Sequence, residues 1–288
     1  ELNPEYALAY NNRGLAYYYL KQYERAIEDY NKALELNPEY ADAYINRGIA
    51  YRRLEQYEKA IEDYNKALEL NPEYALAYNN RGFAYHMLKQ YEKAIGDYNM
   101  AIELNPEYAL AYDNRGFAYT KLKQYERAIE EYNKAIEINP EHSLAYNNRG
   151  FAYHMLKQYK KAIEDYNKAI EINPEYALAY SNRGLAYYHL KQYERAIKEY
   201  NICFDLREKV KGKNKEVFYC GLAFYLLTKD EKILGELKTL QVDDETMRRI
   251  FEFSLRKSKG EEIAEEVKEE LVKEEREEVK LLLELLLK

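Results

Sequence analysis

The hydrophobic and polar positions along the chain follow a helical spacing. Between residues 8 and 20, Tyr10, Gly14 and Tyr17 recur at steps of three and four, which places them on one face of a helix. Between residues 24 and 36, Ala26 and Tyr30 belong to a second apolar face with the same spacing. The pattern therefore predicts two helices joined by a short turn.

This two-helix pattern returns every 34 residues, and four kinds of residue mark the period. They are the prolines Pro4, Pro38, Pro72, Pro106, Pro140 and Pro174, the glycines Gly14, Gly48, Gly82, Gly116, Gly150 and Gly184, the alanines Ala26, Ala60, Ala94, Ala128, Ala162 and Ala196, and the tyrosines Tyr30, Tyr64, Tyr98, Tyr132, Tyr166 and Tyr200. Each proline ends a second helix, because it lacks an N–H donor and disfavours helix at the residue before it. We expect the glycines and alanines to lie where helices approach closely and the tyrosines to fill the space between helices.

These residues, at these offsets, resemble the tetratricopeptide repeat. The resemblance covers residues 1–206 in six repeats, which begin at Ala7, Ala41, Ala75, Ala109, Ser143 and Ala177. It implies an all-α, right-handed α-solenoid that binds other proteins on a concave face lined by the first helix of each pair.

The chain departs from the family pattern at two places in each repeat. An arginine replaces the usual leucine at Arg13 and its equivalents, and an acidic residue follows it sixteen positions later, as at Asp29. We expect these residues to form a structural ion pair within or between repeats, because a buried unpaired guanidinium is costly. The hairpin turn carries Lys21 or an equivalent where glycine is common, which costs about 1 kcal/mol if that backbone is left-handed.

The resemblance places the candidate binding residues on the first helices. One position is always asparagine, and a side-chain amide offers the donor and the acceptor that a peptide backbone needs. This row resembles the asparagine ladder of the O-linked N-acetylglucosamine transferase repeats, where such amides hold an extended peptide; the alternative is that the asparagines only solvate the helix face. The predicted peptide-binding residues are Asn12, Asn46, Asn80, Asn114, Asn148 and Asn182, with Phe83, Phe117, Phe151, His86 and His154 beside them.

The repeat pattern decays after residue 206. We expect a degenerate helical capping region over 207–258 and a long, charged C-terminal helix over 259–288 with a leucine-rich end. Because leucines on nearly every side of a helix do not stay in water, we expect Leu281 to Leu287 to mediate self-association or contact a partner, with docking inside the chain as the alternative.

Charge and composition narrow the functional classes. The net charge of −7 comes almost entirely from residues 261–288, whose eleven acidic and five basic residues leave a balance of −6. The repeats show no strong basic stripe, so we expect no nucleic-acid partner. No apolar run is long enough for a membrane span, and we expect no membrane contact.

The sequence offers no chemistry that points to an enzyme. We find no phosphate-binding loop, no nucleophile motif and no histidines at metal-ligand spacing, and we expect no catalytic residue, cofactor or metal. Cys203 and Cys220 are read as reduced, buried thiols of a cytoplasmic protein. The predicted function is a scaffold that binds a peptide or partner protein; a regulatory or substrate-recruiting arm of a larger enzyme and an RNA-binding helical repeat are the alternatives.

Overall fold

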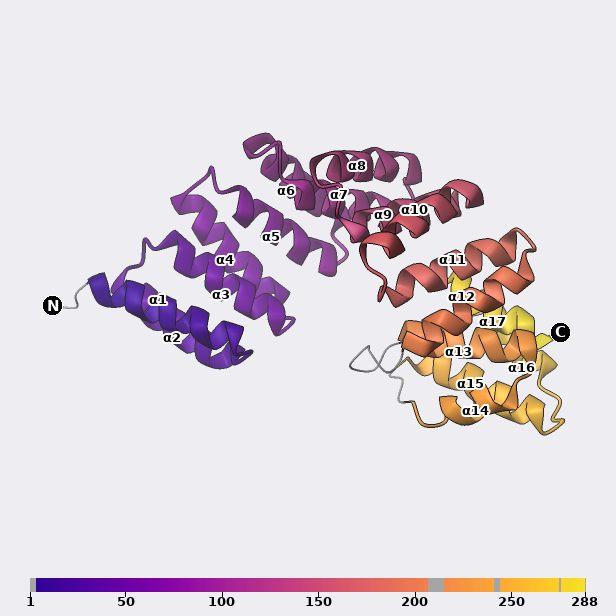
Figure 1. Ribbon diagram of the computed structural model, residues 1–288. Coiled ribbons are helices and arrows are strands. Elements are labelled where there is room, and N and C mark those ends of the chain that lie inside the picture. Colours follow the sequence, from indigo (N-terminus) through magenta and orange to yellow (C-terminus); the bar gives the residue numbers. More distant parts are fainter. Residues whose placement is uncertain (1–3, 207–214, 241–243, 275, 288) are drawn as a thin grey trace. The chain divides into compact units, whose positions relative to one another are not determined.

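Every regular element that the computed structural model describes is an α-helix (Figure 1). The described residues are 4–206, 215–240, 244–274 and 276–287. The chain divides into two compact units, Glu1–Pro140 and Glu141–Lys288.

The first unit consists of four helix pairs, one for each repeat. Its helices are α1 (Pro4–Tyr19), α2 (Tyr23–Leu36), α3 (Ala41–Arg53), α4 (Tyr57–Leu70), α5 (Ala75–Met87), α6 (Tyr91–Leu104), α7 (Ala109–Lys121) and α8 (Tyr125–Ile138). Each first helix packs on the second helix of its own pair and on the second helix of the preceding pair, and consecutive first helices also touch. The predicted helix-turn-helix array is confirmed.

The second unit holds two further pairs and five other helices. The helices are α9 (Ser143–Met155), α10 (Tyr159–Ile172), α11 (Ala177–His189), α12 (Tyr193–Asp205), α13 (Lys215–Thr228), α14 (Glu231–Leu237), α15 (Glu245–Ser258), α16 (Ala264–Lys273) and α17 (Glu277–Leu287). Helix α13 packs on α11 and α12, so one apolar core joins the last repeat to the helices that follow it.

The glycines and tyrosines of the repeat are coupled by contact. A Cβ atom added to Gly82 would lie 2.7 Å from Cε1 of Tyr98, and the equivalent tyrosine stands against the glycine of each other repeat. Tyr98 is 1% exposed. Because any side chain at Gly82 would displace a fully packed ring, the two residues are needed together.

The recurring arginines bind carboxylates of their own repeat. Arg81 donates from Nε and Nη2 to the two oxygens of Asp97 at 2.8 and 2.7 Å, and from Nη1 to Asn65 of the preceding repeat at 2.7 Å. The expected ion pair is confirmed, whereas the link to an asparagine was not foreseen. The other pairs are Arg13–Asp29, Arg47–Asp63, Arg115–Glu131, Arg149–Asp165 and Arg183–Glu199.

The hairpin turns adopt the left-handed backbone conformation that the sequence analysis considered for them. Lys21, Glu55, Lys89, Lys123, Lys157 and Lys191 have φ between 59° and 60°. Each turn therefore carries a strain of about 1 kcal/mol that a glycine would not.

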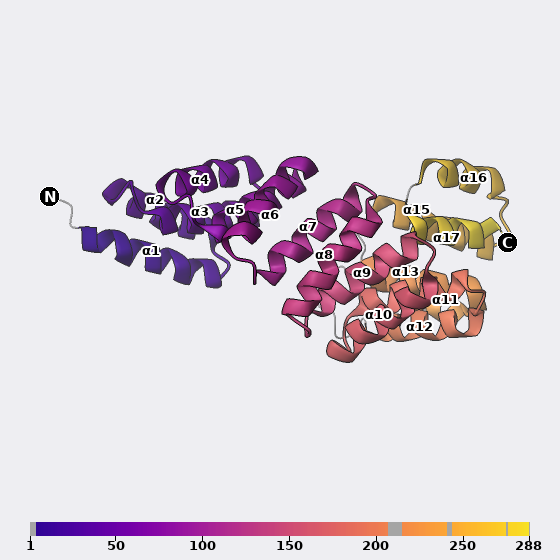
Figure 2. The same cartoon turned by 90° about the horizontal axis from the view of Figure 1, so that it is seen from above.

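The acidic C-terminal segment forms two helices where one was expected. Helices α16 and α17 pack on each other, and α17 also packs on α15 (Figure 2). Glu274, at the end of α16, has an extended backbone, and the Arg276 guanidinium binds both Glu274 and Asp244. The bond to Asp244, 32 residues earlier, is a tertiary contact that favours ending α16 within a stretch of high helical propensity.

The leucine-rich end is covered by the chain itself. Leu281, Leu282, Leu283, Leu285 and Leu286 are 0–4% exposed, and Leu287 is 37% exposed. They belong to the same core as the last repeat. Docking inside the chain, the alternative in the sequence analysis, is what the structure shows.

The expectation of two reduced cysteines is wrong. A disulfide joins Cys203 on α12 to Cys220 on α13, and both residues are fully buried. Their Cα atoms lie 6.1 Å apart, a usual separation for a disulfide. The pairing follows from the packing of α13 on α12, which the repeat pattern does not predict.

Candidate functional site

The first helices expose a row of large apolar side chains. On α5 the row runs through Leu76, Asn80, Phe83 and Met87, at steps of four, three and four, and we call this stripe and its equivalents the first-helix face. In the first unit its exposed apolar members are Leu8, Tyr19, Leu76, Met87, Leu110 and Phe117, which are 37–74% exposed. Exposed apolar side chains that follow one stripe are typical of an interaction surface.

Two ladder asparagines of the first unit are bound to the repeat before them. Asn46 Nδ2 donates to Asn11 Oδ1 at 3.0 Å, and Asn114 Nδ2 donates to Asn79 Oδ1 at 2.9 Å. In the second unit Asn182 donates to Asn147 in the same way at 3.0 Å. The ladder thus links consecutive first helices, a role the sequence analysis did not assign.

One asparagine of the ladder lacks the bond to the preceding repeat, and we call this position the broken rung. Asn80 stands where Asn46 and Asn114 stand, but the residue 35 positions before it is Ile45, which has no acceptor. The Asn80 Nδ2 atom is buried without a hydrogen-bond partner, and the residue is 7% exposed. Of the remaining rungs, Asn12 is exposed on α1 and Asn148 is half-buried on α9.

The aromatic residues of the face are only partly accessible. Phe83 is half-buried under the guanidinium of Arg52, whose Cζ lies 4.7 Å from the ring centroid. Phe117 is exposed and stacks on His86, with centroids 4.8 Å apart and ring planes 12° apart. Phe151 is half-buried on α9.

The two histidines assigned to the face lie beneath it. His86 is 6% exposed and His154 is 5% exposed. Burial, and then the charge of Lys121, lower the pKa of His86 to about 4. Burial, and then His189, lower the pKa of His154 to about 3. Both imidazoles are therefore neutral near pH 7 and pack among aromatic rings.

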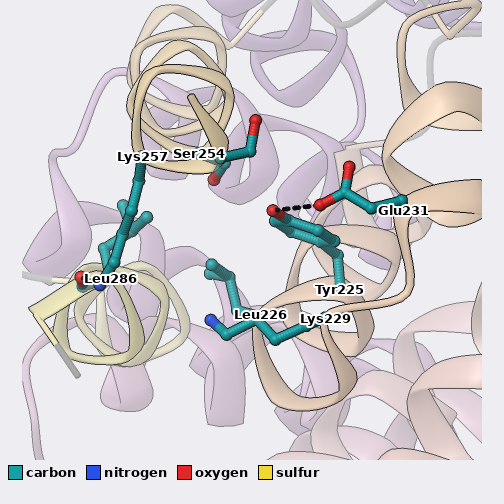
Figure 3. Close-up of a pocket in the computed structure, with 8 residues that line it drawn as sticks. Tyr225, Leu226, Lys229, Glu231, Ser254, Lys257 and Leu286 are labelled. Carbon is teal, nitrogen blue, oxygen red and sulfur yellow. Dashed lines mark hydrogen bonds between the residues drawn. The ribbon is translucent and has the colours of Figure 1, made fainter. Parts of the chain in front are cut away.

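A separate cavity of about 220 Å³ lies in the second unit between α13, α15 and α17 (Figure 3). The Tyr225 hydroxyl donates to Glu231 at 3.3 Å, and the Lys257 ammonium donates to the Leu286 carbonyl. Lys257 thus satisfies a carbonyl at the C-terminal end of α17. We interpret this cavity as a junction that fastens α17 to α15.

Within the described ranges, no three His, Cys, Asp or Glu side chains come together as metal ligands. None of the helices that the structure describes has the length and apolarity to cross a bilayer.

Comparison with known proteins gives consistent family matches. Tetratricopeptide-repeat models match residues 7–40, 41–74, 75–108, 98–130, 143–176 and 165–198, and a TPR repeat model matches residues 118–157. No curated protein matches the chain.

Several solved structures share the fold. A MamA protein is 30% identical over 60% of this chain and 94% of its own, with a TM-score of 0.53. YrrB, described as a TPR protein with an unusual peptide-binding site, is 26% identical over 62% of this chain and 92% of its own, with a TM-score of 0.50. A tetratricopeptide repeat protein from Parabacteroides merdae ATCC 43184 is 19% identical over 86% of this chain and 98% of its own, with a TM-score of 0.68. With the helix pairs and their 34-residue period, these matches show that the chain belongs to the tetratricopeptide-repeat family.

Proposed function

We propose that this protein is a protein-interaction scaffold whose first-helix face binds an extended segment of a partner protein. The observation that carries the proposal is the row of exposed apolar side chains that alternates with amide groups along this face in the first unit. Apolar side chains supply the buried area that binding needs, and amides supply hydrogen bonds to a peptide backbone.

Variation among the repeats supports the same face. The position of Tyr19 holds Arg53, Met87 and Lys121 in the next three repeats, while the glycine and tyrosine that fill the interior are the same in all six. Side chains that are not needed for packing differ between repeats, which is what recognition of a non-repetitive partner requires. YrrB, which shares the fold, is described as having a peptide-binding site.

The geometry of the ladder sets the spacing of the ligand. Packed helices lie about 8–10 Å apart, and an extended chain rises about 3.3 Å per residue, so each repeat should accommodate roughly three residues. A peptide of about nine residues then spans about three repeats.

The test uses peptides selected on the whole chain from a random phage-displayed library of about this length. The affinity of a selected peptide is measured by fluorescence anisotropy for the wild type and for Asn46→Ala/Asn114→Ala. That variant removes two face amides together with their bonds to Asn11 and Asn79. The matched control, Asn11→Ala/Asn79→Ala, removes the same two bonds and leaves the face amides in place.

We expect the first variant to bind about 10-fold or more weakly and the control to bind nearly as the wild type does, since two hydrogen bonds to the peptide are lost. Equal affinity of both variants and the wild type for every selected peptide would show that the ladder only links repeats. Failure to select any peptide would reject peptide binding itself.

A further inference from the structure

Arg52, near the end of α3, is chemically different from its equivalents in the other repeats. Those equivalents are Tyr18, His86, Thr120, His154 and Tyr188, none of which carries a fixed charge. Arg52 is half-buried and adjoins the first-helix face, where it covers Phe83 of the next repeat.

The Arg52 guanidinium has no carboxylate partner among the residues that the structure describes. Its Nε atom is buried without a hydrogen bond, and so is the hydroxyl of nearby Tyr64. Burial raises the pKa of Tyr64 far above its usual range, and the charge of Arg52 and its close side-chain contact with the Tyr64 hydroxyl oppose this shift. By contrast, Arg47, five residues earlier on the same helix, is bound to Asp63 through two nitrogens. A partly buried charge without a counter-charge is unfavourable, and an anion brought by a ligand would relieve that cost.

The broken rung lies at the same junction between the second and third repeats. Asn80 precedes Phe83 by one helical turn, and its Nδ2 atom lacks the bond that Asn46 and Asn114 make. Glu55, three residues after Arg52, forms no ion pair with it among the described residues, and Asp42 lies at the other end of α3, about 15 Å away along the helix. The neighbouring Arg53 faces the preceding repeat, where it donates from Nε to Tyr18 Oη of α1 at 2.9 Å. This junction therefore combines a cation without a carboxylate partner, Arg52, with a buried donor that lacks a partner, Asn80 Nδ2.

We propose that the α3–α5 junction binds an Asp or Glu side chain of the partner segment, with the Arg52 guanidinium as the cation that receives the carboxylate. The proposal rests on the proposed function and names the chemistry of its ligand. Phe83 holds the guanidinium flat from below, as aromatic rings commonly do for arginine. Exposed apolar positions continue on both sides of the junction, at Leu8 on α1 and Leu110 on α7. The bound segment therefore passes through the junction, which favours an acidic side chain over a chain terminus.

The experiment repeats the peptide selection on the wild type and on Arg52→Gln, using the whole chain. The wild type should select peptides with Asp or Glu at a fixed distance from an apolar residue. A selected peptide and its Glu→Gln or Asp→Asn counterpart are then titrated against both proteins. Lys66→Gln is the matched control, because it removes one positive charge from the exposed side of α4, where Lys66 pairs with Glu69.

Loss of the carboxylate from the peptide, or of the charge at Arg52, should each weaken binding about 10-fold or more, since a charge-assisted hydrogen bond is lost. Both losses together should weaken binding little further, because the two groups contact each other. Lys66→Gln should bind as the wild type does. If Arg52→Gln does not fold, Arg52→Tyr replaces it, because the first and sixth repeats already carry tyrosine at this position.

Four results would overturn the proposal. Selected peptides without an acidic preference, or an unchanged preference in Arg52→Gln, would reject the carboxylate site and leave peptide binding intact. Equal weakening by Lys66→Gln would assign the effect to overall charge. If the library yields no peptide at all, the proposed function fails and the carboxylate site fails with it.

Discussion

Each repeat holds one charged pair where tetratricopeptide repeats usually carry leucine. The Arg81 and Asp97 side chains are 19% and 8% exposed, and two short hydrogen bonds join them. Replacing one partner leaves the other buried and uncompensated, whereas replacing both removes the charges together. The pair is therefore a structural element of the hairpin and is not available for a ligand.

We expect Arg81→Leu to destabilise the protein by about 3–5 kcal/mol, because it leaves the Asp97 carboxylate buried without its cation. Asp97→Asn should also be destabilising, and Arg81→Leu/Asp97→Asn should be more stable than the sum of the two single effects predicts. Urea unfolding of the four proteins measures the coupling. Strictly additive changes in the free energy of unfolding would contradict the contact.

The buried histidines make a second prediction at this scale. The folded-state pKa of His154 is about 3, below its ordinary value of 6.5, so below pH 6.5 the unfolded chain binds a proton that the folded chain does not. Through His154 alone, stability should therefore fall by about 2 kcal/mol between about pH 7 and about pH 5, and His86, with a pKa of about 4, should add a decrease of similar size. His154→Gln should reduce this slope when urea midpoints are compared across that range. His142→Gln serves as the control, since His142 is half-buried and lies outside α9. An equal slope in the wild type and in His154→Gln would show that the histidine titrates normally.

At the scale of helices, the 34-residue period was enough to predict the pairs from α1 to α12. The reason is physical: Gly82 and Tyr98 fit only each other, so the period records contacts between helices. Contacts that depend on how repeats stack were harder to predict. The Asn46–Asn11 bond requires knowledge of which turns of two first helices face each other.

Features held by tertiary contacts alone were not predictable from the pattern. The end of α16 and the start of α17 coincide with the long-range bond from Arg276 to Asp244, while the local sequence favours helix. At the candidate site, the sequence shows that Arg52 stands where the other five repeats carry residues without a fixed charge. That Arg52 has no carboxylate partner could be recognised only from the structure, because ion pairing depends on which residues are neighbours in space.

The disulfide makes a prediction about the joint between α12 and α13. Its two cysteines are 17 residues apart, and a loop of this length restrains the unfolded chain by about 3 kcal/mol. We expect dithiothreitol to lower the urea midpoint of the second unit in the wild type and to have no effect on Cys203→Ala/Cys220→Ala. If the wild type unfolds identically with and without the reductant, the cross-link does not form in solution.

At the scale of the whole molecule, the repeats do not end on an open apolar surface. Helix α13 covers α11 and α12, and α17 contacts α13 and α15 in turn. Terminal covers of this kind are needed in repeat proteins, because a bare last repeat exposes its packing face. The acidic residues of 261–269 lie on exposed positions of the cover, where water solvates their charge.

The burial of α17 predicts which of its leucines are needed for stability. Leu282 is fully buried in the core of the second unit, whereas Leu287 is 37% exposed. A lysine at position 282 would have to bury its charge or expel α17, which should cost several kcal/mol and unfold the cover at about room temperature. Leu287→Lys places the charge in water and should leave stability nearly unchanged.

Light scattering and urea unfolding of both variants distinguish docking inside the chain from self-association through this helix. Docking requires a monomeric wild type and a destabilised Leu282→Lys. A concentration-dependent wild-type dimer that Leu287→Lys dissociates without loss of stability would instead show that the leucine-rich end joins two copies of the chain.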